Sequence, residues 1–308
     1  MTPRLPLILG ALLLCFALPA RSDIVYVRSF GGGSTSENRL SAPAGLSVGF
    51  EGMLWVADAA ENRVLAFDST GAERMRIGYA GSGEGRFLEP TDVAAGEGLH
   101  LYVLDAGNER VQVFDRYGQF NEVILSREAG TIGVPVGIEA DPFGRLYVTD
   151  AEEDLVRVFR SYTGEEEFTL GGFGAEEGRF RLPADVAADR ARRIYVADRE
   201  NGRIQVFDAL GAFLYAFGAE DGPGRLVEPA AVAVDRFGFI FVADAGEGRL
   251  AVYRQGGVFA AEVRNLPDGA ALGSPRGVAV GEGGILYVSD TENGRIHQFR
   301  YAFPARAR

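Results

Sequence analysis

Six aspartates recur along the chain at intervals of 45 to 48 residues, and an arginine stands five residues after five of them. The aspartates are Asp58, Asp105, Asp150, Asp198, Asp244 and Asp290, and the arginines are Arg63, Arg110, Arg203, Arg249 and Arg295. A carboxylate and a guanidinium this close in sequence could form a catalytic pair or a charge-assisted structural contact. A catalytic pair is needed once in a site, whereas this pair is repeated along the whole chain. We therefore interpret it as a structural contact across a tight turn between two strands.

The third unit departs from this pattern, because Leu155 stands where the other units have arginine. Arg157 lies two residues further along the predicted strand and therefore on the same face, since side chains of a strand alternate between its faces. Arg157 is accordingly the candidate partner of Asp150 in this unit.

Other positions repeat in phase with the aspartates. A proline lies fifteen residues before each aspartate, an aromatic residue lies nine residues after it, and an apolar residue lies three residues before each proline. Each unit of about 45 residues predicts four short strands, as in "DVAAD", "IYVAD", "RIQVF" and "FLYAF" of the fourth unit. Repeats of this length and content are typical of propeller blades. We predict an all-β fold, a six-bladed β-propeller with four antiparallel strands per blade.

The two ends of the sequence distinguish a closed ring from a solenoid, the alternative arrangement of such repeats. A solenoid would need terminal repeats with a polar outer face, and the sequence shows none. The sixth unit instead ends after its third strand, while residues 24–32, "IVYVRSFGG", resemble a fourth strand. We expect this N-terminal strand to complete the last blade, which would close the ring and leave no exposed sheet edge.

The repeated motifs resemble those of the NHL-repeat family. They are the strand that begins with proline, the "YVAD" strand, turns such as "NGR", the "VFD" strand and glycine-rich loops such as "GSGEGRFLEP". The resemblance extends over residues 24–302 and implies a six-bladed propeller. It does not fix an activity, because one fold hosts many functions.

A propeller usually binds its partners around the mouth of the central channel, where the turns between second and third strands and the loops between blades meet. Two residues after the repeated proline, near this mouth, the six units carry Gly45, Asp92, Gly137, Asp185, Ala231 and Gly277. Asp92 and Asp185 could hold a metal or act as acid and base; alternatively, each caps backbone N–H groups where a strand begins. Arg276 is a candidate contact for an anion, and the alternative is a solvated side chain.

An enzyme on this fold would need residues that the sequence mostly lacks. Similar propeller lyases use histidines, and propeller lactonases bind a divalent metal through Glu, Asn and Asp. The chain has only His100 and His297, which fall in different parts of their units, so we interpret both as packing residues rather than zinc ligands. No serine lies in a nucleophile elbow. The sequence favours a non-catalytic binding protein without a cofactor; the alternative is a metal-dependent hydrolase or lyase that uses Asp92 and Asp185.

Acidic residues gather in the turn of the third unit, where Glu152, Glu153 and Asp154 are consecutive. The corresponding turns of the other units add Glu61, Glu109, Glu200, Glu247 and Glu292. Together they predict a negative rim, interrupted by Arg199 and Arg276. Such a rim would suit a basic segment of a protein partner or a weakly held Ca²⁺. The alternative is a solvated acidic surface that keeps the protein soluble.

The first 22 residues have the pattern of a secretory signal peptide, with Arg4, an apolar core, and small residues at Ala20 and Ser22. The core is shorter than the roughly 20 residues of a membrane span, although a signal anchor is the alternative. We therefore expect residues 23–308 to be exported to the periplasm or secreted, without spanning a membrane. Cleavage would leave 29 arginines and 43 acidic residues, a net charge of −14. This charge argues against nucleic acids and anionic membranes as partners and leaves a protein, a peptide or a glycan of the cell envelope.

Overall fold

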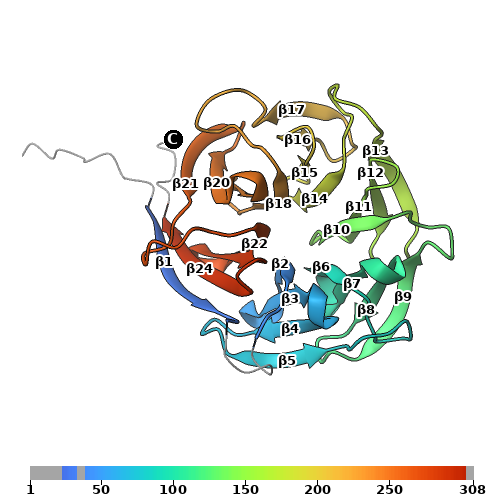
Figure 1. Cartoon of the computed structure of the whole chain (residues 1–308). Helices are drawn as coiled ribbons and strands as arrows, with labels where there is room; N and C mark the ends of the chain where they lie inside the picture. The colour runs from blue at the N-terminus through green and yellow to red at the C-terminus, as the bar shows by residue number, and fades with distance from the viewer. Residues whose placement is uncertain (1–22, 33–38, 303–308) are drawn as a thin grey trace, which may run out of the picture.

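The computed structural model describes residues 23–32 and 39–302, which form six four-stranded antiparallel sheets arranged around a central axis (Figure 1). The prediction of an all-β, six-bladed propeller with four antiparallel strands per blade is confirmed. The expected signal peptide, residues 1–22, lies outside the described residues. No helix in the described part of the chain is long and apolar enough to cross a membrane.

The strands of the first three blades follow the chain from the axis outward. Blade 1 consists of β2 (Pro43–Val48), β3 (Leu54–Asp58), β4 (Arg63–Phe67) and β5 (Glu73–Ile77). Blade 2 consists of β6 (Pro90–Ala95), β7 (Leu101–Asp105), β8 (Arg110–Phe114) and β9 (Phe120–Ser126). Blade 3 consists of β10 (Pro135–Ala140), β11 (Arg145–Asp150), β12 (Leu155–Arg160) and β13 (Glu166–Gly171).

Blades 4 and 5 repeat this order, and blade 6 takes its outer strand from the other end of the chain. Blade 4 consists of β14 (Pro183–Ala188), β15 (Ile194–Asp198), β16 (Arg203–Phe207) and β17 (Phe213–Phe217). Blade 5 consists of β18 (Pro229–Val234), β19 (Ile240–Asp244), β20 (Arg249–Arg254) and β21 (Val258–Val263). Blade 6 consists of β22 (Pro275–Gly281), β23 (Ile285–Asp290), β24 (Arg295–Ala302) and β1 (Asp23–Phe30).

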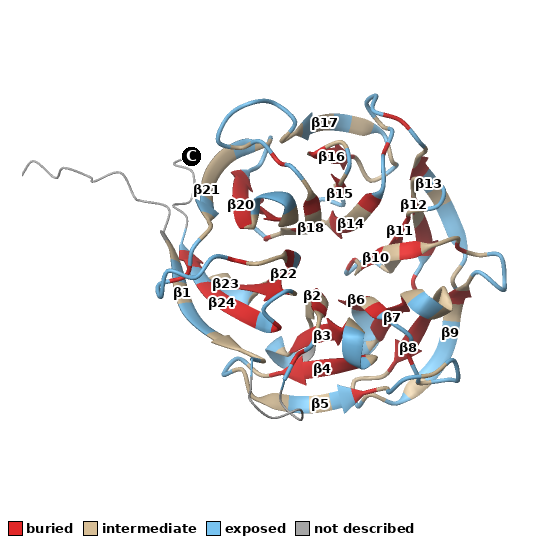
Figure 2. Cartoon of the chain, viewed as in Figure 1, coloured by how far each residue is buried: buried red, intermediate tan, exposed pale blue. Residues whose placement is uncertain are grey.

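The hydrophobic core lies between neighbouring blades. The second and third strands of the blades are mostly buried on both faces, while the outer strands alternate between half-buried and exposed residues (Figure 2). The repeated aromatic residue of one blade packs against the apolar residue before the proline, as in Phe180 and Phe207, whose ring centroids are 5.7 Å apart. The invariant spacing seen in the sequence therefore reflects packing that recurs between blades.

Strand β1 closes the ring, as expected from the sequence. It pairs antiparallel with β24, and Ile24 lies opposite Tyr301 (Figure 1). Phe30 at its end contacts Phe67 of blade 1 with ring centroids 5.1 Å apart, and Tyr26 contacts Phe299 at 5.8 Å. The same short strand thus completes the sheet of blade 6 and contacts the neighbouring blade.

The antiparallel pairing gives the ring two different ends. In blade 4, for example, Pro183 lies opposite Asp198, and Asp198 lies opposite Arg203, so these three residues share one end. We call this end, with its turns between second and third strands and its loops between blades, the upper face. The lower face carries the turns between first and second strands and between third and fourth strands.

Candidate functional site

The repeated aspartates lie in fully buried positions at the upper face. Asp198 accepts hydrogen bonds from the backbone N–H of Arg181 (2.8 Å) and from Nε of Arg203 (2.7 Å). The second guanidinium branch of Arg203 donates to the backbone carbonyls of Glu176 and Arg179. Asp198 and Arg203 therefore connect the loop between blades 3 and 4 to the hairpin of β15 and β16, which supports the structural interpretation.

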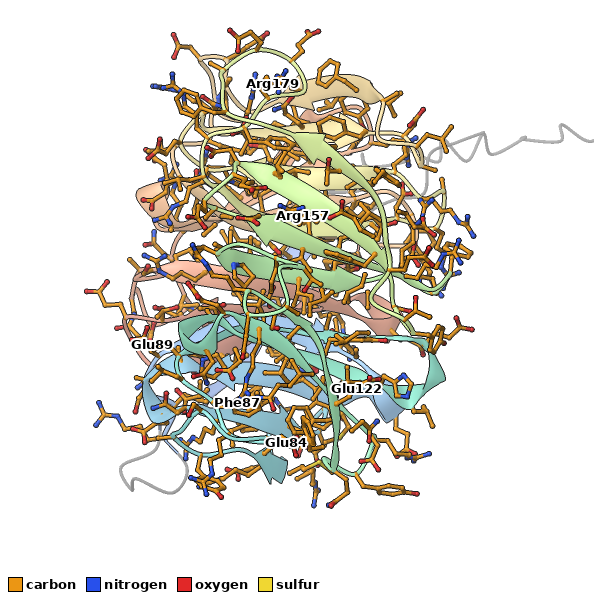
Figure 3. The ribbon with its side chains drawn as sticks, turned by 90° about the vertical axis from the view of Figure 1, so that its right-hand side faces the viewer. Glu84, Phe87, Glu89, Glu122, Arg157 and Arg179 are labelled. Carbon is orange, nitrogen blue, oxygen red and sulfur yellow. The ribbon has the colours of Figure 1, made fainter. Side chains whose placement is uncertain are left out.

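In the third and sixth units, other residues form the side-chain contact with the repeated aspartate. Arg157 of β12 is labelled in Figure 3. It donates through Nε to Oδ2 of Asp150 at 3.3 Å, as the sequence suggested. In blade 6 the expected contact of Arg295 with Asp290 is wrong. Arg295 is exposed, and the buried His297, two residues further along the same strand, places Nε2 3.2 Å from Oδ2 of Asp290. Burial raises the pKa of Asp290, but hydrogen bonds from His297, from Asn293 and from backbone amides hold it below its ordinary value.

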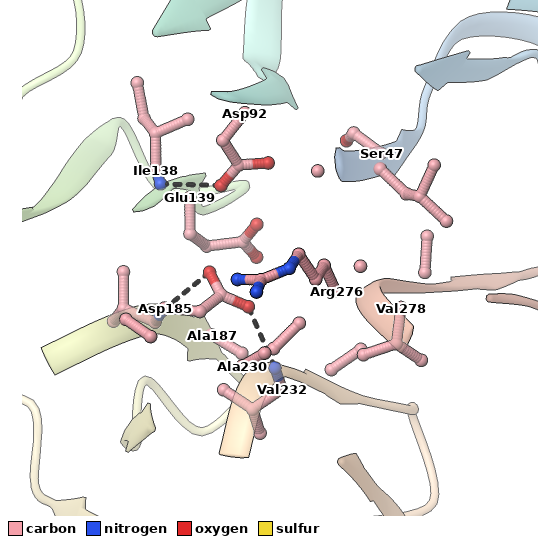
Figure 4. Close-up of a pocket in the computed structure, with 18 of the residues that line it drawn as sticks. Ser47, Asp92, Ile138, Glu139, Asp185, Ala187, Ala230, Val232, Arg276 and Val278 are labelled. Carbon is pink, nitrogen blue, oxygen red and sulfur yellow. Dashed lines mark hydrogen bonds between the residues drawn. The ribbon is translucent and has the colours of Figure 1, made fainter. Parts of the chain in front are cut away.

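The innermost strands of the six blades surround a channel, and the upper part of this channel is a pocket of about 340 Å³ (Figure 4). Alanine, valine and glycine make up most of its wall. The polar residues that line it are Ser47, Thr91, Asp92, Glu139, Asp185, Arg199 and Arg276. This pocket brings together all of the predicted site residues except those of the acidic turn.

Asp92 and Asp185 each join two blades. Oδ1 of Asp92 accepts the N–H of Val93, and Oδ2 accepts the N–H of Ile138 in the next blade, both at 2.8 Å. Asp185 does the same with Val186 and Val232, again at 2.8 Å (Figure 4). The backbone-capping alternative therefore describes their geometry, and every carboxylate oxygen of the two residues already has a backbone donor.

The glycines that alternate with these aspartates leave room for them. A Cβ on Gly45 would lie 1.8 Å from Oδ1 of Asp92, and a Cβ on Gly137 would lie 2.6 Å from the carbonyl oxygen of Ala184 beside Asp185. Because such approaches are far inside van der Waals contact, packing against Asp92 and Asp185 requires glycine at positions 45 and 137.

Glu139 is a channel residue that the sequence analysis missed. It stands on β10, four residues after the repeated proline, where the other units carry Ser47, Ala94, Ala187, Ala233 and Ala279. A single glutamate among small residues was the available signal. Burial raises the pKa of Glu139 to about 8, with further contributions from the charges of Asp185 and Asp141.

The three channel carboxyls share one low-dielectric environment. Burial raises the pKa of Asp185 to about 7. Burial and the charge of Asp185 raise the pKa of Asp92 well above its ordinary value, although two backbone N–H groups oppose the shift. Crowded carboxyls of this kind hold protons near neutral pH.

The two arginines at the mouth differ in their contacts. Arg199 donates through Nε to Oε1 of Glu228 at 2.7 Å, so its charge is paired within the chain. Arg276 is exposed, and within the described residues it has no ion-pair partner. Its guanidinium points across the pocket toward Glu139 and Asp185 (Figure 4). Of the two arginines that line this pocket, Arg276 is therefore the one available to a ligand.

Much of the charge in the predicted acidic rim is paired within the chain. Glu152 lies 3.0 Å from Arg127, and Glu153 forms an ion pair with Arg157. Oδ1 of Asp154 accepts the N–H of Leu182 at 2.7 Å. Among the other rim acids, Glu61 accepts from Ser41, Glu109 pairs with Arg127, and Glu247 pairs with Arg264. Among the described rim acids, Glu61 and Asp154 have hydrogen bonds but no ion pair, whereas the side chains of Glu200 and Glu292 have neither.

The two histidines lie in different blades and do not contact each other. His297 lies in blade 6, whereas the ring of His100 contacts Tyr102 and Tyr162 near the lower face. Across residues 23–32 and 39–302, no three His, Cys, Asp or Glu side chains lie where they could hold a metal ion.

The protonation of Glu139 predicts a pH dependence of stability. Between its ordinary pKa near 4.5 and about 8, the folded protein holds a proton that the unfolded chain releases, so stability falls as the pH rises through this range. Replacement of Glu139 by Gln should stabilise the protein at about pH 9 and change it less at about pH 5. Thermal melts at both pH values check this, with the exposed Glu84→Gln as the control. Equal effects of Glu139→Gln at both pH values would contradict the shifted pKa.

The NHL-repeat family model matches three stretches of the chain, residues 87–114, 180–207 and 272–299. Each stretch runs from the apolar residue before the proline to the aromatic residue at the end of the third strand. None of the curated proteins compared with the chain matches it.

Solved structures share the fold at low sequence identity. A streptogramin B lyase is 13% identical, with 91% of this chain and 98% of that chain covered and a TM-score of 0.62. A gluconolactonase from Xanthomonas campestris is 13% identical, with 92% and 91% covered and a TM-score of 0.69. A chain of a nidogen/laminin complex is 16% identical, with 72% and 80% covered and a TM-score of 0.58. The chain is therefore a six-bladed β-propeller, and three stretches of it match the NHL-repeat model.

Proposed function

We propose that the protein is an exported, non-catalytic scaffold that binds a protein, a peptide or a glycan of the cell envelope at its upper face. The observation that carries this proposal is the bonding of Asp92 and Asp185. Their four carboxylate oxygens accept backbone N–H groups of their own and the next blades. Each carboxylate thus has a structural role in the ring, linking its own blade to the next one, that does not depend on a ligand.

The charged side chains of the upper face that have no partner within the described residues could bind a peptide segment. Arg276 offers an exposed guanidinium, which binds a carboxylate through two parallel hydrogen bonds. Glu200 and Glu292 offer exposed carboxylates to basic side chains on the same face. The fold is also used for protein binding elsewhere, since one solved relative belongs to a nidogen/laminin complex.

A hydrolase or lyase is the second candidate, and Glu139 is the observation in its favour. A carboxyl with a pKa of about 8 can act as a general acid near neutral pH. Two solved relatives are described as a streptogramin B lyase and a gluconolactonase. A metal-dependent reaction would use the lone pairs of Asp92 and Asp185 that the backbone N–H groups leave free.

The test compares the exported chain with Arg276→Glu and with Arg254→Glu, an exposed arginine at the other end of the ring. Crosslinking in intact cells, followed by fractionation and mass spectrometry, should recover from the envelope a partner that Arg276→Glu loses and Arg254→Glu keeps. Equal recovery by both variants, or a protein found in the cytoplasm, would contradict the proposal.

A second experiment distinguishes a binding protein from a metal-dependent enzyme. Titration calorimetry with Zn²⁺ and Ca²⁺ should show no tight stoichiometric site if the channel is non-catalytic, although weak Ca²⁺ binding at the rim remains a prediction. Tight binding of one metal that Asp92→Asn and Asp185→Asn abolish, while the fold is retained, would favour the hydrolase or lyase. The role of the rim is tested by the double variant Glu200→Lys with Glu292→Lys. Charge reversal in the acidic turn is a poorer test, because Glu153 and Asp154 also form structural contacts.

A further inference from the structure

The lower end of the channel opens into a second pocket of about 650 Å³. Its wall comes from the lower turns of blades 1, 4, 5 and 6, together with the end of β6 and Tyr301 of β24. The volume lies within the range of sites that hold small molecules or peptide side chains. None of the polar residues of the upper pocket lines this one, although the two pockets share apolar wall residues such as Val48 and Ala188.

One side of this pocket has an excess of cationic side chains, because four arginines of its turns outnumber Asp189 and Asp235, although the chain has a net charge of −12. Arg190 and Arg236 line it from neighbouring blades, and Arg192 lies in the same turn as Arg190. All three are exposed, and within the described residues none of them forms an ion pair. Arg193 of the same turn, in contrast, pairs with Asp189 at 2.6 Å. The three guanidinium groups therefore remain available to an anion.

Exposed aromatic rings accompany these arginines. Phe237 is 66% exposed, and the guanidinium of Arg236 lies over its ring at 4.7 Å from the centroid. Phe143 is 44% exposed, and Arg192 lies over it at 4.3 Å. A guanidinium stacked on a ring is held in place and still presents its edge to a carboxylate.

The turns that carry these groups are held by their own side chains. Oδ1 of Asp235 accepts the N–H groups of Phe237 and Phe239, both at 2.8 Å. Oδ1 of Asp189 accepts those of Ala191 and Arg193 at 2.8 and 2.9 Å. Because the backbone of both turns is fixed, less entropy is lost when a ligand binds.

The turns between first and second strands in blades 1, 2 and 6 carry acidic residues, which limits the kind of anion that fits. Glu51 and Glu282 line the pocket from blades 1 and 6, and Glu97 stands in the lower turn of blade 2. A long polyanion or an anionic membrane would cover the whole face and meet these carboxylates. A short acidic segment can cover the cationic side alone.

We propose that the lower mouth of the channel is a second binding site, which takes a short acidic peptide segment of a partner protein through Arg190, Arg192 and Arg236. An apolar side chain of the segment packs against Phe237. The protein then has two binding faces of different character, and the lower one functions whether or not the upper face binds as proposed.

The probe is a fluorescent peptide in which Asp and Glu residues flank a single Phe, and binding is followed by fluorescence anisotropy. Arg190→Glu with Arg236→Glu should weaken its binding by at least about tenfold, as removal of close charge pairs does at other interfaces. The matched control is Arg225→Glu with Arg254→Glu, two exposed arginines outside the pocket, which should bind as the parent does. Phe237→Ala should weaken binding as well. Thermal melts establish that all variants are folded.

Three results would overturn the proposal. They are equal binding by the two double variants, equal binding of a peptide with Lys in place of Asp and Glu, and no binding to the parent at low salt. The protein could instead bind a single-stranded oligonucleotide or phosphatidylglycerol vesicles more tightly than the peptide, and lose this binding in Arg190→Glu with Arg236→Glu. The ligand of the lower mouth would then be a nucleic acid or a membrane, and the proposal of an acidic peptide would be wrong. Loss of the upper-face partner in Arg276→Glu leaves the outcome of this experiment unaffected.

Discussion

Removal of residues 24–30 is expected to leave a chain that aggregates, or unfolds at a temperature at which the full protein is stable. Without β1 the edge of β24 is exposed, and an unpaired edge offers its N–H and C=O groups to other chains. Ile24, Tyr26 and Phe30 also lose their packing against the cores of blade 6 and its neighbours. Three half-buried side chains of this size contribute on the order of 3–5 kcal/mol, a large share of the stability of a typical domain.

Point variants on the same strand provide the control for this deletion. Tyr26→Ala and Phe30→Ala should each lower the thermal midpoint, because both rings pack against neighbouring aromatic residues. Val25→Ala and Val27→Ala should have little effect, since both side chains point to solvent. Size-exclusion chromatography and thermal melts check these results. A truncated chain that stays monomeric and melts with the parent would show that closure by β1 contributes little.

Replacement of Asp198 by Ala is expected to destabilise the protein by about 3–5 kcal/mol, because it leaves a largely buried arginine without its partner. The change also removes the acceptor of Asn201, Gln205 and the backbone N–H of Arg181. Arg203→Ala should cost less, about 1–3 kcal/mol, since the carboxylate keeps its other donors. Chemical denaturation measures both changes in the free energy of unfolding.

Glu200→Ala is the matched control for Asp198→Ala, because Glu200 lies in the same turn and its side chain is exposed. It should change the free energy of unfolding by less than about 0.5 kcal/mol. Binding at the upper mouth should survive Asp198→Ala wherever the protein remains folded. A stable Asp198→Ala variant that had lost its partner would assign the repeated pair to function and would refute the structural interpretation.

The fold was predictable because its contacts repeat in sequence. The apolar residue, the proline, the aspartate and the aromatic residue recur at fixed spacings, and each spacing corresponds to a strand or to packing between blades. The contact of Asp150 with Arg157, in place of the arginine that is missing at position 155, also followed from the alternation of side chains along a strand. The contact of Asp290 with His297 instead of Arg295 did not follow, because both residues stand on the same face of one strand.

The channel and the rim were harder to predict, because they depend on residues about one blade apart in sequence. Glu139 carries no motif, and its shifted pKa comes from burial and from Asp185, which lies on another strand. The number of charges at the rim was visible in the sequence, but their pairing was not. Glu152, for instance, is neutralised by Arg127 from the preceding blade.

The pairing of Ile24 with Tyr301 also constrains how the chain can fold. The first described strand must wait for nearly the whole chain to be made before its partner exists, so closure is the contact of greatest sequence separation. Contacts of this kind form slowly, because a long loop must be closed before they stabilise the protein. A nascent or prematurely terminated chain can build blades 1 to 5 but keeps an open ring, with β1 unpaired and aggregation-prone. Completion of the last blade thus distinguishes a chain that extends through β24 from a shorter fragment.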